Sequence, residues 1–329
     1  MAGVIGVGSM GRNHARVYAG AARGVTLAGV HDADMGRARA VAREWGCGAY
    51  PDVRSLLRVC DVVSIASPTP LHTAQVREAV EAGVAVLVEK PLAPTVEEAR
   101  ALARFLAARP DAPVVQVGHI EHHNPAVREL APVLEDTELL AVEIHRVGPW
   151  EPRVQHIDVV LDLMLHDVHV VLGLARAPLV SAQAEGRRVH SARHLDYAVA
   201  NLVFADGLIA TLTASRLGSH KVRRLMVTTP DAQVDLDYVD RTITTTRSRS
   251  FQARPGSGGY VHQTTMERIV LPIEEPLVAE IRSFVDAVGR GVPPSVDVDA
   301  GVRALEVIEA VKASIATGSR MPVPGRRAA

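Results

Sequence analysis

One apolar stretch, residues 158–175, carries ionisable side chains at helical spacing. Asp158, Asp162 and His166 are four residues apart and His169 follows three later, so a helix would place all four on one face among Val, Leu and Met. Ionisable groups on a buried helix are costly unless they are paired or put to use. A carboxylate one turn from an imidazole can hold and move a proton near neutral pH. The stretch therefore predicts one wall of an active site.

A glycine-rich turn near the start of the chain indicates a dinucleotide site. The sequence G-V-G-S-M-G stands between a strand pattern and a helix pattern. Its first glycine permits a tight turn, the second lets a pyrophosphate approach, and the third lets helix and strand pack closely. The amides at the start of the helix then face the anion. The residues of this turn that we predict to bind the cofactor are Gly6, Gly8, Ser9, Met10 and Gly11.

An acidic residue further along favours NAD as that cofactor. Asp32 ends the second strand pattern, VTLAGVHD, about 20 residues after the turn, where a carboxylate accepts hydrogen bonds from the adenosine ribose. The same carboxylate would repel a phosphate on that ribose, so NAD is favoured over NADP. Arg12 and Arg37 are close enough in sequence to keep NADP as the alternative.

Composition restricts the class of partner. Lys and Arg number 36 and Asp and Glu 37, so no strong overall field would attract nucleic acid or a membrane surface, and a small molecule is expected. The two cysteines fit neither a disulfide framework nor structural zinc, which indicates a reducing compartment. The start of the chain has no signal-peptide pattern, and no apolar run approaches the ~20 residues that cross a bilayer. We expect a soluble cytoplasmic protein.

Two patterns of elements divide the chain near residue 118. Over residues 1–118, Val- and Ala-rich strands alternate with helices, which predicts an α/β domain with a doubly wound parallel sheet. Residues 119–329 predict an α+β domain with a large, open, mostly antiparallel sheet, closed by two amphipathic helices that can pack back on the first domain. Within it, the Gly-, Ser- and Arg-rich residues 247–265 predict a mobile loop, and residues 321–329 a disordered tail.

Two further motifs end strands at the ligand side of the parallel sheet. S-P-T-P-L-H, Ser67–His72, follows the strand VVSIA, and V-E-K-P, Val88–Pro91, follows AVLV. With these residues and the helix D-L-M-L-H-D, the sequence resembles the glucose-fructose oxidoreductase, inositol dehydrogenase and rhizopine-catabolism (Gfo/Idh/MocA) family from residue 3 to about 317. The resemblance implies a Rossmann domain that binds NAD(P), a second domain that holds the substrate on its sheet, and a homodimer or homotetramer.

The resemblance also implies which residues act. Carried over position by position, Lys90 of E-K-P and Asp162 and His166 of the D-x-x-x-H helix form the catalytic group. The family's residues near the cofactor fall on Ser67, Thr69, His72, Glu89 and Lys90. The chemistry agrees, since His166 is suited to be the base for a hydroxyl proton, Lys90 can stabilise charge on the substrate oxygen, and Asp162 can orient the imidazole. We therefore expect NAD-dependent oxidation of a secondary ring hydroxyl of a sugar, nucleotide sugar or cyclitol.

Two segments resemble one branch of the family, which includes dehydrogenases acting on the 3-hydroxyl of UDP-N-acetylglucosamine. They are V-G-H-I-E-H-H-N-P-A-V, residues 117–127, and R-V-G-P-W-E-P-R, residues 146–153. This sequence has His122-His123 where the branch has Arg-Phe, and the lost positive charge makes a free amino sugar or cyclitol a rival substrate. Two arginines could still grip a diphosphate. The predicted substrate residues are Arg146, Arg153, His119 and His123.

Three alternatives stay open beside the dehydrogenase. The first is a metal site built from His119, Glu121, His122 and His123 with Asp162 and His166, although their spacing matches no strong ligand motif and we expect no metal. The second is a non-enzymatic dinucleotide sensor, which Lys90 and His166 argue against. The third is the family's NAD-dependent glycosidase chemistry, in which the cofactor is recycled within each turnover and NADH does not accumulate.

Overall fold

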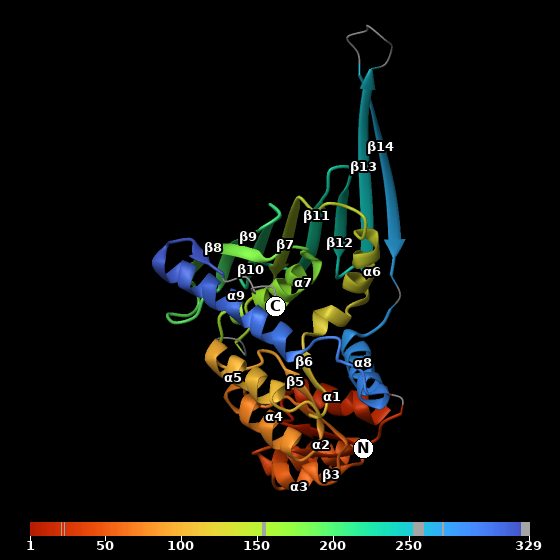
Figure 1. Cartoon of the computed structure of the whole chain (residues 1–329), viewed down its shortest axis with the longest axis vertical. Helices are drawn as coiled ribbons and strands as arrows, with labels where there is room; N and C mark the ends of the chain where they lie inside the picture. Colours follow the sequence, from red (N-terminus) through yellow and green to blue (C-terminus); the bar gives the residue numbers. More distant parts are fainter. Residues whose placement is uncertain (21, 23, 153–155, 253–259, 272, 324–329) are drawn as a thin grey trace. The chain divides into compact units, whose positions relative to one another are not determined.

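A computed structural model describes the chain except for residues 21, 23, 153–155, 253–259, 272 and 324–329. The chain forms two compact units, whose elements are labelled in Figure 1. The first unit is Met1–Asn124 with Glu274–Glu306, and the second is Pro125–Ile273 with Val307–Ala329. The first unit therefore extends beyond residue 118, where the sequence patterns divide, and includes a segment from near the end of the chain.

The first unit is built on a parallel sheet with the strand order β3-β2-β1-β4-β5-β6, which confirms the doubly wound α/β prediction. Every residue of β4 and β5 is buried, as expected where helices cover both faces of a sheet. The strands are β1 (Ala2–Ile5), β2 (Leu27–His31), β3 (Gly48–Ala49), β4 (Val62–Ile65), β5 (Ala85–Glu89) and β6 (Val115–Gly118).

Local capping explains where several helices of this unit begin. The Asp34 side chain accepts hydrogen bonds from the amides of Gly36 and Arg37, and Thr95 accepts one from Glu98, each satisfying a backbone donor of a first helical turn. The helices are α1 (Ser9–Gly20), α2 (Met35–Trp45), α3 (Val53–Leu57), α4 (His72–Glu81), α5 (Val96–Ala107) and α8 (Pro276–Arg290), with short 3-10 turns η1 (Thr69–Leu71) and η2 (Ile120–His123).

Helix α8 belongs to the core of the first unit although the whole second sheet precedes it in the sequence. Its residues Ile281 and Phe284 are fully buried in the same apolar cluster as Val4 of β1 and Tyr18 of α1. Residue contacts connect α8 with α1, β5 and η2. The amphipathic pattern of α8 is therefore satisfied inside this unit, which positions its polar residues as well.

The second unit is built on a nine-stranded sheet with the order β14-β13-β12-β11-β7-β10-β9-β8-β15. All its neighbouring strands are antiparallel except β7 and β10, which confirms the mostly antiparallel prediction. The strands are β7 (Ala141–Val147), β8 (Leu179–Arg187), β9 (Tyr197–Phe204), β10 (Ile209–Ser215), β11 (Val222–Thr228), β12 (Gln233–Asp237), β13 (Thr242–Gln252), β14 (Tyr260–Val270) and β15 (Met321–Pro322).

The helices that accompany this sheet include the segment with the predicted catalytic residues Asp162 and His166. They are α6 (Pro125–Val133), a π-helical turn η4 (Val160–Met164), α7 (Leu165–Leu174) and α9 (Val298–Thr317), whose residues are shared between the two units. Among the described residues, every helix is too short or too polar to span a bilayer.

The expectation of a mobile loop over residues 247–265 is wrong for its described part. Strands β13 and β14 pair in register, from Thr242 opposite Val270 to Arg247 opposite Thr265 and beyond, and they form the long hairpin drawn in teal and light blue in Figure 1. Every residue of β13 from Arg247 to Gln252 has a cross-strand partner on β14, and such pairs are the unit that stabilises a sheet. Residues 253–259 lie outside the described residues. So does most of the predicted tail, of which Met321 and Pro322 pair with β8.

Candidate active site and cofactor site

The glycine turn between β1 and α1 has the geometry of a pyrophosphate cradle. Gly6 has a φ of +82°, and a Cβ there would lie 2.6 Å from the Ser67 backbone. A Cβ at Gly11 would lie 1.8 Å from the Gly6 carbonyl oxygen, whereas one at Gly8 would meet nothing within 4 Å. Two glycines are thus required by close packing and the third leaves open space. The exposed Ser9 and Met10 begin α1 beside this space, so the residues present fit a dinucleotide phosphate.

Asp32 is held on that turn by its own hydrogen bonds. Its side chain is 92% buried, with Oδ2 accepting from the Val7 amide at 2.8 Å and Oδ1 from the Asp34 amide at 2.9 Å. Arg37 Nη1 lies 3.4 Å from both oxygens, while Arg12 pairs with Glu44. Of the two arginines that keep NADP open, Arg37 is therefore the one beside the predicted ribose site.

His72 connects the two motif turns that follow β4 and β5. Its Nε2 lies 2.8 Å from the Ser67 carbonyl oxygen and its Nδ1 lies 2.9 Å from that of Pro91. The ring is 1% exposed, and burial lowers the pKa of His72 although both carbonyl oxygens favour the protonated ring. The ring is thus a bridge that holds the S-P-T-P and E-K-P turns together. Ser67 Oγ donates to Gln75 Oε1, and Thr69 begins η1 half-buried.

Glu89 and Lys90 stand at the end of β5 with different surroundings. The Glu89 carboxylate faces the interior, where Oε1 is 2.9 Å from Nε2 of His14 on α1, and its Oε2 accepts from the Lys90 amide at 3.2 Å. Lys90 is half-buried. The turn is therefore anchored to α1 through Glu89, and His14 is a residue that the motifs did not indicate.

The helix with the predicted catalytic pair is not a regular α-helix. Residues Val160–Met164 form a π-helical turn before α7 begins at Leu165. The i to i+5 bonding of such a turn changes the register assumed for a continuous stripe, and π turns are frequent at functional sites. Asp162 lies within this turn and His166 follows it, half-buried. Asp158 precedes the turn and accepts a hydrogen bond from the Leu195 amide at 2.8 Å.

Asp162 forms an ion pair that sequence reasoning missed. Arg216 Nη2 lies 2.8 Å from Asp162 Oδ2, and Arg216 Nη1 donates to the Ile157 carbonyl oxygen at 2.6 Å. Arg216 is 4% exposed and directly follows β10. An arginine immediately after a buried strand was the available signal. The pair holds the π-helical turn against the end of the sheet.

Arg146, a predicted substrate residue, lies in a second buried ion pair. Its Nη2 is 2.7 Å and its Nε 2.8 Å from Asp167 Oδ1, with Arg146 5% and Asp167 1% exposed. The guanidinium also lies over the Tyr238 ring, 5.8 Å from its centroid. Pairing with Asp167 on α7 accounts for the burial of Arg146 without a substrate phosphate. Arg153 lies outside the described residues.

His119 and His123 lie in the first unit at the end of β6. They are 1% and 4% exposed, and His123 Nε2 lies 3.4 Å from Ser295 Oγ. Among the described residues, a group whose ligand atoms lie within 4.8 Å of one another is formed by His14, Glu89 and Glu280, none of which belongs to the metal alternative. Lys90 also belongs to the first unit, whereas Asp162 and His166 belong to the second.

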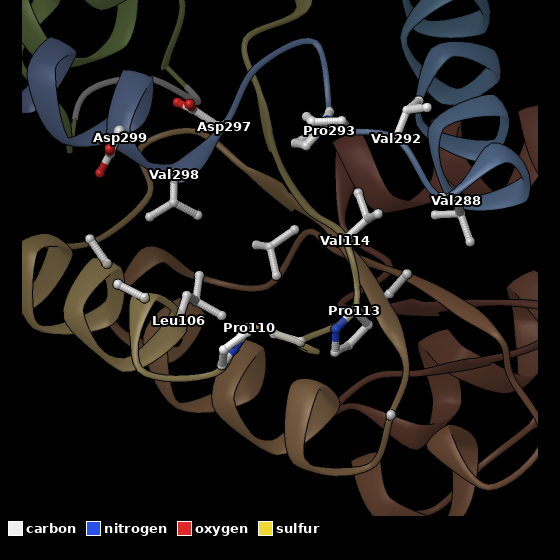
Figure 2. Close-up of a pocket in the computed structure, with 18 of the residues that line it drawn as sticks. Leu106, Pro110, Pro113, Val114, Val288, Val292, Pro293, Asp297, Val298 and Asp299 are labelled. Atoms are coloured by element: carbon white, nitrogen blue, oxygen red, sulfur yellow. The ribbon is translucent and has the colours of Figure 1, made fainter.

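A cavity of about 730 Å³ in the first unit lies at the amino ends of the parallel strands, away from the glycine turn and the E-K-P motif (Figure 2). Its lining includes Asp61, Ala85 and Val115, which stand at the starts of β4, β5 and β6, together with the Pro110 and Val292 side chains. Doubly wound folds bind ligands at the carboxyl ends of their strands, where the glycine turn and E-K-P stand. We therefore do not place the cofactor in this cavity.

Comparison with known proteins agrees with this geometry. A model described as oxidoreductase family, NAD-binding Rossmann fold, matches residues 1–119, and one described as GFO/IDH/MocA C-terminal domain matches residues 138–233. A UDP-N-acetylglucosamine 3-dehydrogenase from Acidithiobacillus ferrooxidans is 35% identical over 313 residues, which cover 95% of this chain and 96% of the relative. A solved structure of that enzyme superposes with a TM-score of 0.84 over 95% of this chain and 96% of the other, at 34% identity.

Cyclitol dehydrogenases are also similar. A scyllo-inositol 2-dehydrogenase (NAD(+)) from Bacillus subtilis is 26% identical over an alignment of 346 positions, gaps included. The alignment covers 99% of this chain and 96% of the relative. The structure of a myo-inositol dehydrogenase from Lactobacillus casei in complex with NAD(H) and myo-inositol has a TM-score of 0.80 over 100% of this chain and 98% of the other, and its 20% identity shows a shared fold. The chain therefore belongs to the Gfo/Idh/MocA family of oxidoreductases, with that family's NAD-binding Rossmann domain and C-terminal domain.

Proposed function

We propose that this chain is an NAD-dependent dehydrogenase that oxidises a secondary ring hydroxyl of a sugar, nucleotide sugar or cyclitol. The observation that carries the proposal is the cradle at the glycine turn, where Gly8 is open and Asp32 is bonded to the Val7 amide, in a member of an oxidoreductase family. The substrate class follows the relatives, one named for UDP-N-acetylglucosamine and several for inositols.

The chain's own residues divide the work of binding the cofactor. The amides at Gly8, Ser9 and Met10 receive the pyrophosphate, and Asp32 accepts hydrogen bonds from the adenosine ribose. Ser67, Thr69 and Lys90 stand on turns at the carboxyl ends of β4 and β5. His72 and Glu89 hold those turns from inside, since both are buried and bonded to neighbouring turns or helices.

Each catalytic side chain has one role in the proposed reaction. When bound, NAD would supply the acceptor for the hydride that leaves the carbon bearing the hydroxyl. His166 takes the hydroxyl proton, so that the electron pair of the O–H bond forms the new carbonyl as the hydride leaves. Lys90 stabilises the negative charge that develops on that oxygen. Asp162, ionised beside Arg216, orients the imidazole and stabilises its protonated form.

A substrate panel tests the proposal and separates it from its alternatives. Purified protein is incubated with NAD and with nucleotide sugars, free sugars or cyclitols, and NADH absorbance is followed. Net NADH accumulation with one class supports the dehydrogenase. Sugar release without NADH accumulation would indicate the glycosidase chemistry, and NAD binding without turnover of any substrate would indicate a sensor.

Diphosphate recognition is a finer part of the same proposal. With Arg146 paired to Asp167, it depends on Arg153. If the best substrate carries a diphosphate, Arg153→Ala is expected to raise its Michaelis constant by a factor equivalent to ~1.5–3 kcal/mol, while a free sugar or cyclitol is unaffected. An unchanged Michaelis constant for a nucleotide sugar would remove Arg153 from substrate binding.

We also infer a homodimer or homotetramer. Both faces of β14 carry exposed apolar side chains, with Met266 67% and Val270 75% exposed on one face and Ile269 43% on the other. Exposed apolar groups of this extent on an open sheet favour burial by a partner, and a second copy is the simplest one. Sedimentation velocity tests the inference, since a monomer at micromolar concentration would contradict it.

Because Cys47 and Cys60 are both free, we propose the cytoplasm as the compartment of this protein, which cell fractionation tests.

A further inference from the structure

Three ionisable side chains from distant parts of the sequence meet inside the first unit. His14 lies on α1, Glu89 ends β5 and Glu280 lies on α8. The imidazole of His14 and both carboxyl groups each offer an atom within 4.8 Å of the others. His14 and Glu280 are 0% exposed and Glu89 is 8% exposed. Neither the glycine turn nor the E-K-P motif requires an acid on α8.

Hydrogen bonds around His14 form a chain from Tyr18 through Ser64 to Glu89. Tyr18 Oη and His14 Nδ1 each lie 2.9 Å from Ser64 Oγ, and His14 Nε2 lies 2.9 Å from Glu89 Oε1. In one arrangement, Tyr18 Oη donates to Ser64 Oγ, Ser64 Oγ donates to His14 Nδ1, and His14 Nε2–H donates to Glu89. Each of these three hydrogens then has an acceptor, and the imidazole of His14 is neutral. The chain of donors then ends on an ionised Glu89.

Glu280 is the member of the group that this chain of donors does not serve. Its two carboxyl oxygens are buried and accept no hydrogen bond from any donor in the described residues. A second carboxylate beside Glu89 would place two negative charges close together in a buried environment, which is strongly unfavourable. Burial, and then the charge of Glu89, raise the pKa of Glu280 well above its ordinary value. A neutral carboxylic acid can donate its own proton.

We propose that Glu280 is a permanently protonated acid whose O–H donates to Glu89, which makes it a positioning residue for the E-K-P turn. Glu89 then receives His14 Nε2–H, the Glu280 O–H and the amide of Lys90, the last at 3.2 Å. These three donors come from α1, α8 and the turn itself. Glu280 thereby secures the backbone that carries Lys90 without contacting substrate or cofactor. The kinetic part of this inference rests on the proposed dehydrogenase function.

A bound divalent cation is the alternative way to neutralise two carboxylates. The group supplies three ligands, whereas cations with imidazole and carboxylate ligands take four to six. The other polar groups adjoining it, Ser64 and Tyr18, are bonded to each other. Ligation by His14 Nε2 would also remove its hydrogen bond to Glu89. A proton needs none of these changes, so the observations favour the proton.

The test compares two substitutions at one position with a matched control on the same helix. Glu280→Gln keeps a neutral donor of nearly the same shape, and Glu280→Leu removes the donor. Asp286→Asn changes an exposed acid of α8 and controls for altered helix charge. All three are made in the full chain and studied with and without NAD.

The first readout is thermal stability as a function of pH, which does not depend on activity. When a carboxyl group has a higher pKa in the folded than in the unfolded protein, its contribution to stability is complete at pH values below the unfolded-state pKa. This contribution decreases as the pH rises from the unfolded-state pKa toward the folded-state pKa. Between about pH 5 and pH 8 the wild type is therefore expected to lose melting temperature relative to Glu280→Gln, progressively with pH. Asp286→Asn is expected to follow the wild type. A stability difference between the two proteins that stays constant over this pH range, or that shifts in favour of the wild type as pH rises, would overturn the proposal, because a buried acid with a raised pKa must lose stability there.

The second readout is kinetic, on the best substrate of the panel. Glu280→Gln is expected to keep kcat within about threefold of the wild type, whereas Glu280→Leu lowers kcat about 10- to 100-fold with a small change in Michaelis constant, because a displaced Lys90 affects the transition state most. If Glu280→Leu does not fold, the pH series on Glu280→Gln still decides.

Elemental analysis of dialysed protein tests the metal alternative. One divalent cation per chain in the wild type, lost in Glu280→Gln, would show that a metal ion and not a proton neutralises the two carboxyl groups. If no substrate reacts, the stability series still tests the protonated acid.

Discussion

Asp32 at the end of β2 accepts a hydrogen bond of 2.8 Å from the backbone amide of Val7, 25 residues earlier in the glycine turn. This bond joins the predicted ribose site and the predicted pyrophosphate site into one rigid arrangement. The carboxylate is therefore oriented by the protein before any ligand arrives.

From this relationship we predict that NAD binds more tightly than NADP and that Asp32→Ala removes the preference. Loss of hydrogen bonds to a charged acceptor is expected to weaken NAD binding by ~1.5–3 kcal/mol, while NADP gains from reduced repulsion and from Arg37. Isothermal titration calorimetry with both cofactors measures the effect. Arg37→Ala is the companion variant and should weaken NADP only. Equal affinities in the wild type would contradict the prediction.

For the chemistry, we predict that Lys90→Ala and His166→Ala each lower turnover by ~10² or more and leave NAD affinity nearly unchanged, because both side chains act in the transition state. Steady-state kinetics and NAD titration of the same preparations separate the two effects. A variant with near-normal turnover would lose its place in the mechanism. A variant that loses NAD affinity as well would be assigned to cofactor binding.

The ion pair between Arg216 and Asp162 gives a prediction about a residue that no motif indicates. Arg216→Ala leaves Asp162 without its buried partner and releases the Ile157 carbonyl, so we expect a loss of about 2 kcal/mol of unfolding free energy and about a tenfold fall in kcat. Urea unfolding and kinetics measure both. Arg224→Ala, which breaks exposed pairs with Asp235 and Asp237, should cost well under about 1 kcal/mol. Similar losses of stability and activity in Arg216→Ala and Arg224→Ala would contradict the assignment of Arg216 as the residue that positions Asp162.

Arg146 and Asp167 provide a test of structure against substrate binding. Removing either partner of this buried pair should destabilise the protein by about 3–5 kcal/mol, and the double variant Arg146→Met with Asp167→Leu should cost less than the sum. Chemical unfolding of the four proteins gives the coupling. Unchanged stability of Arg146→Met, with a raised Michaelis constant for nucleotide sugars alone, would instead support a role in binding the diphosphate.

The sequence alone was sufficient for features whose signals are local. The spacing of Gly6, Gly8 and Gly11 is dictated by one tight turn and one close packing contact, so their roles can be read without knowing the rest of the fold. Alternating strands and helices up to residue 118 predict a parallel sheet because only crossover connections join parallel strands. The pair Asp206-Gly207 between the antiparallel strands β9 and β10 is a further local signal, because a tight hairpin turn needs a positive φ and Gly207 has a φ of +94°.

Only the tertiary structure decided which distant residues meet. Arg216 and Asp162 are 54 positions apart, and their pairing depends on the position of β10 in the sheet, which no local pattern specifies. Glu280 reaches Glu89 because the apolar face of α8 is buried in the first unit, although the second sheet intervenes in the sequence. The π-helical turn at Val160–Met164 and the pairing of β13 with β14 likewise depend on partners elsewhere in the chain. Periodicity identifies the buried face of an element, whereas long-range packing selects the element that it contacts and thereby the chemistry of the polar groups at the contact.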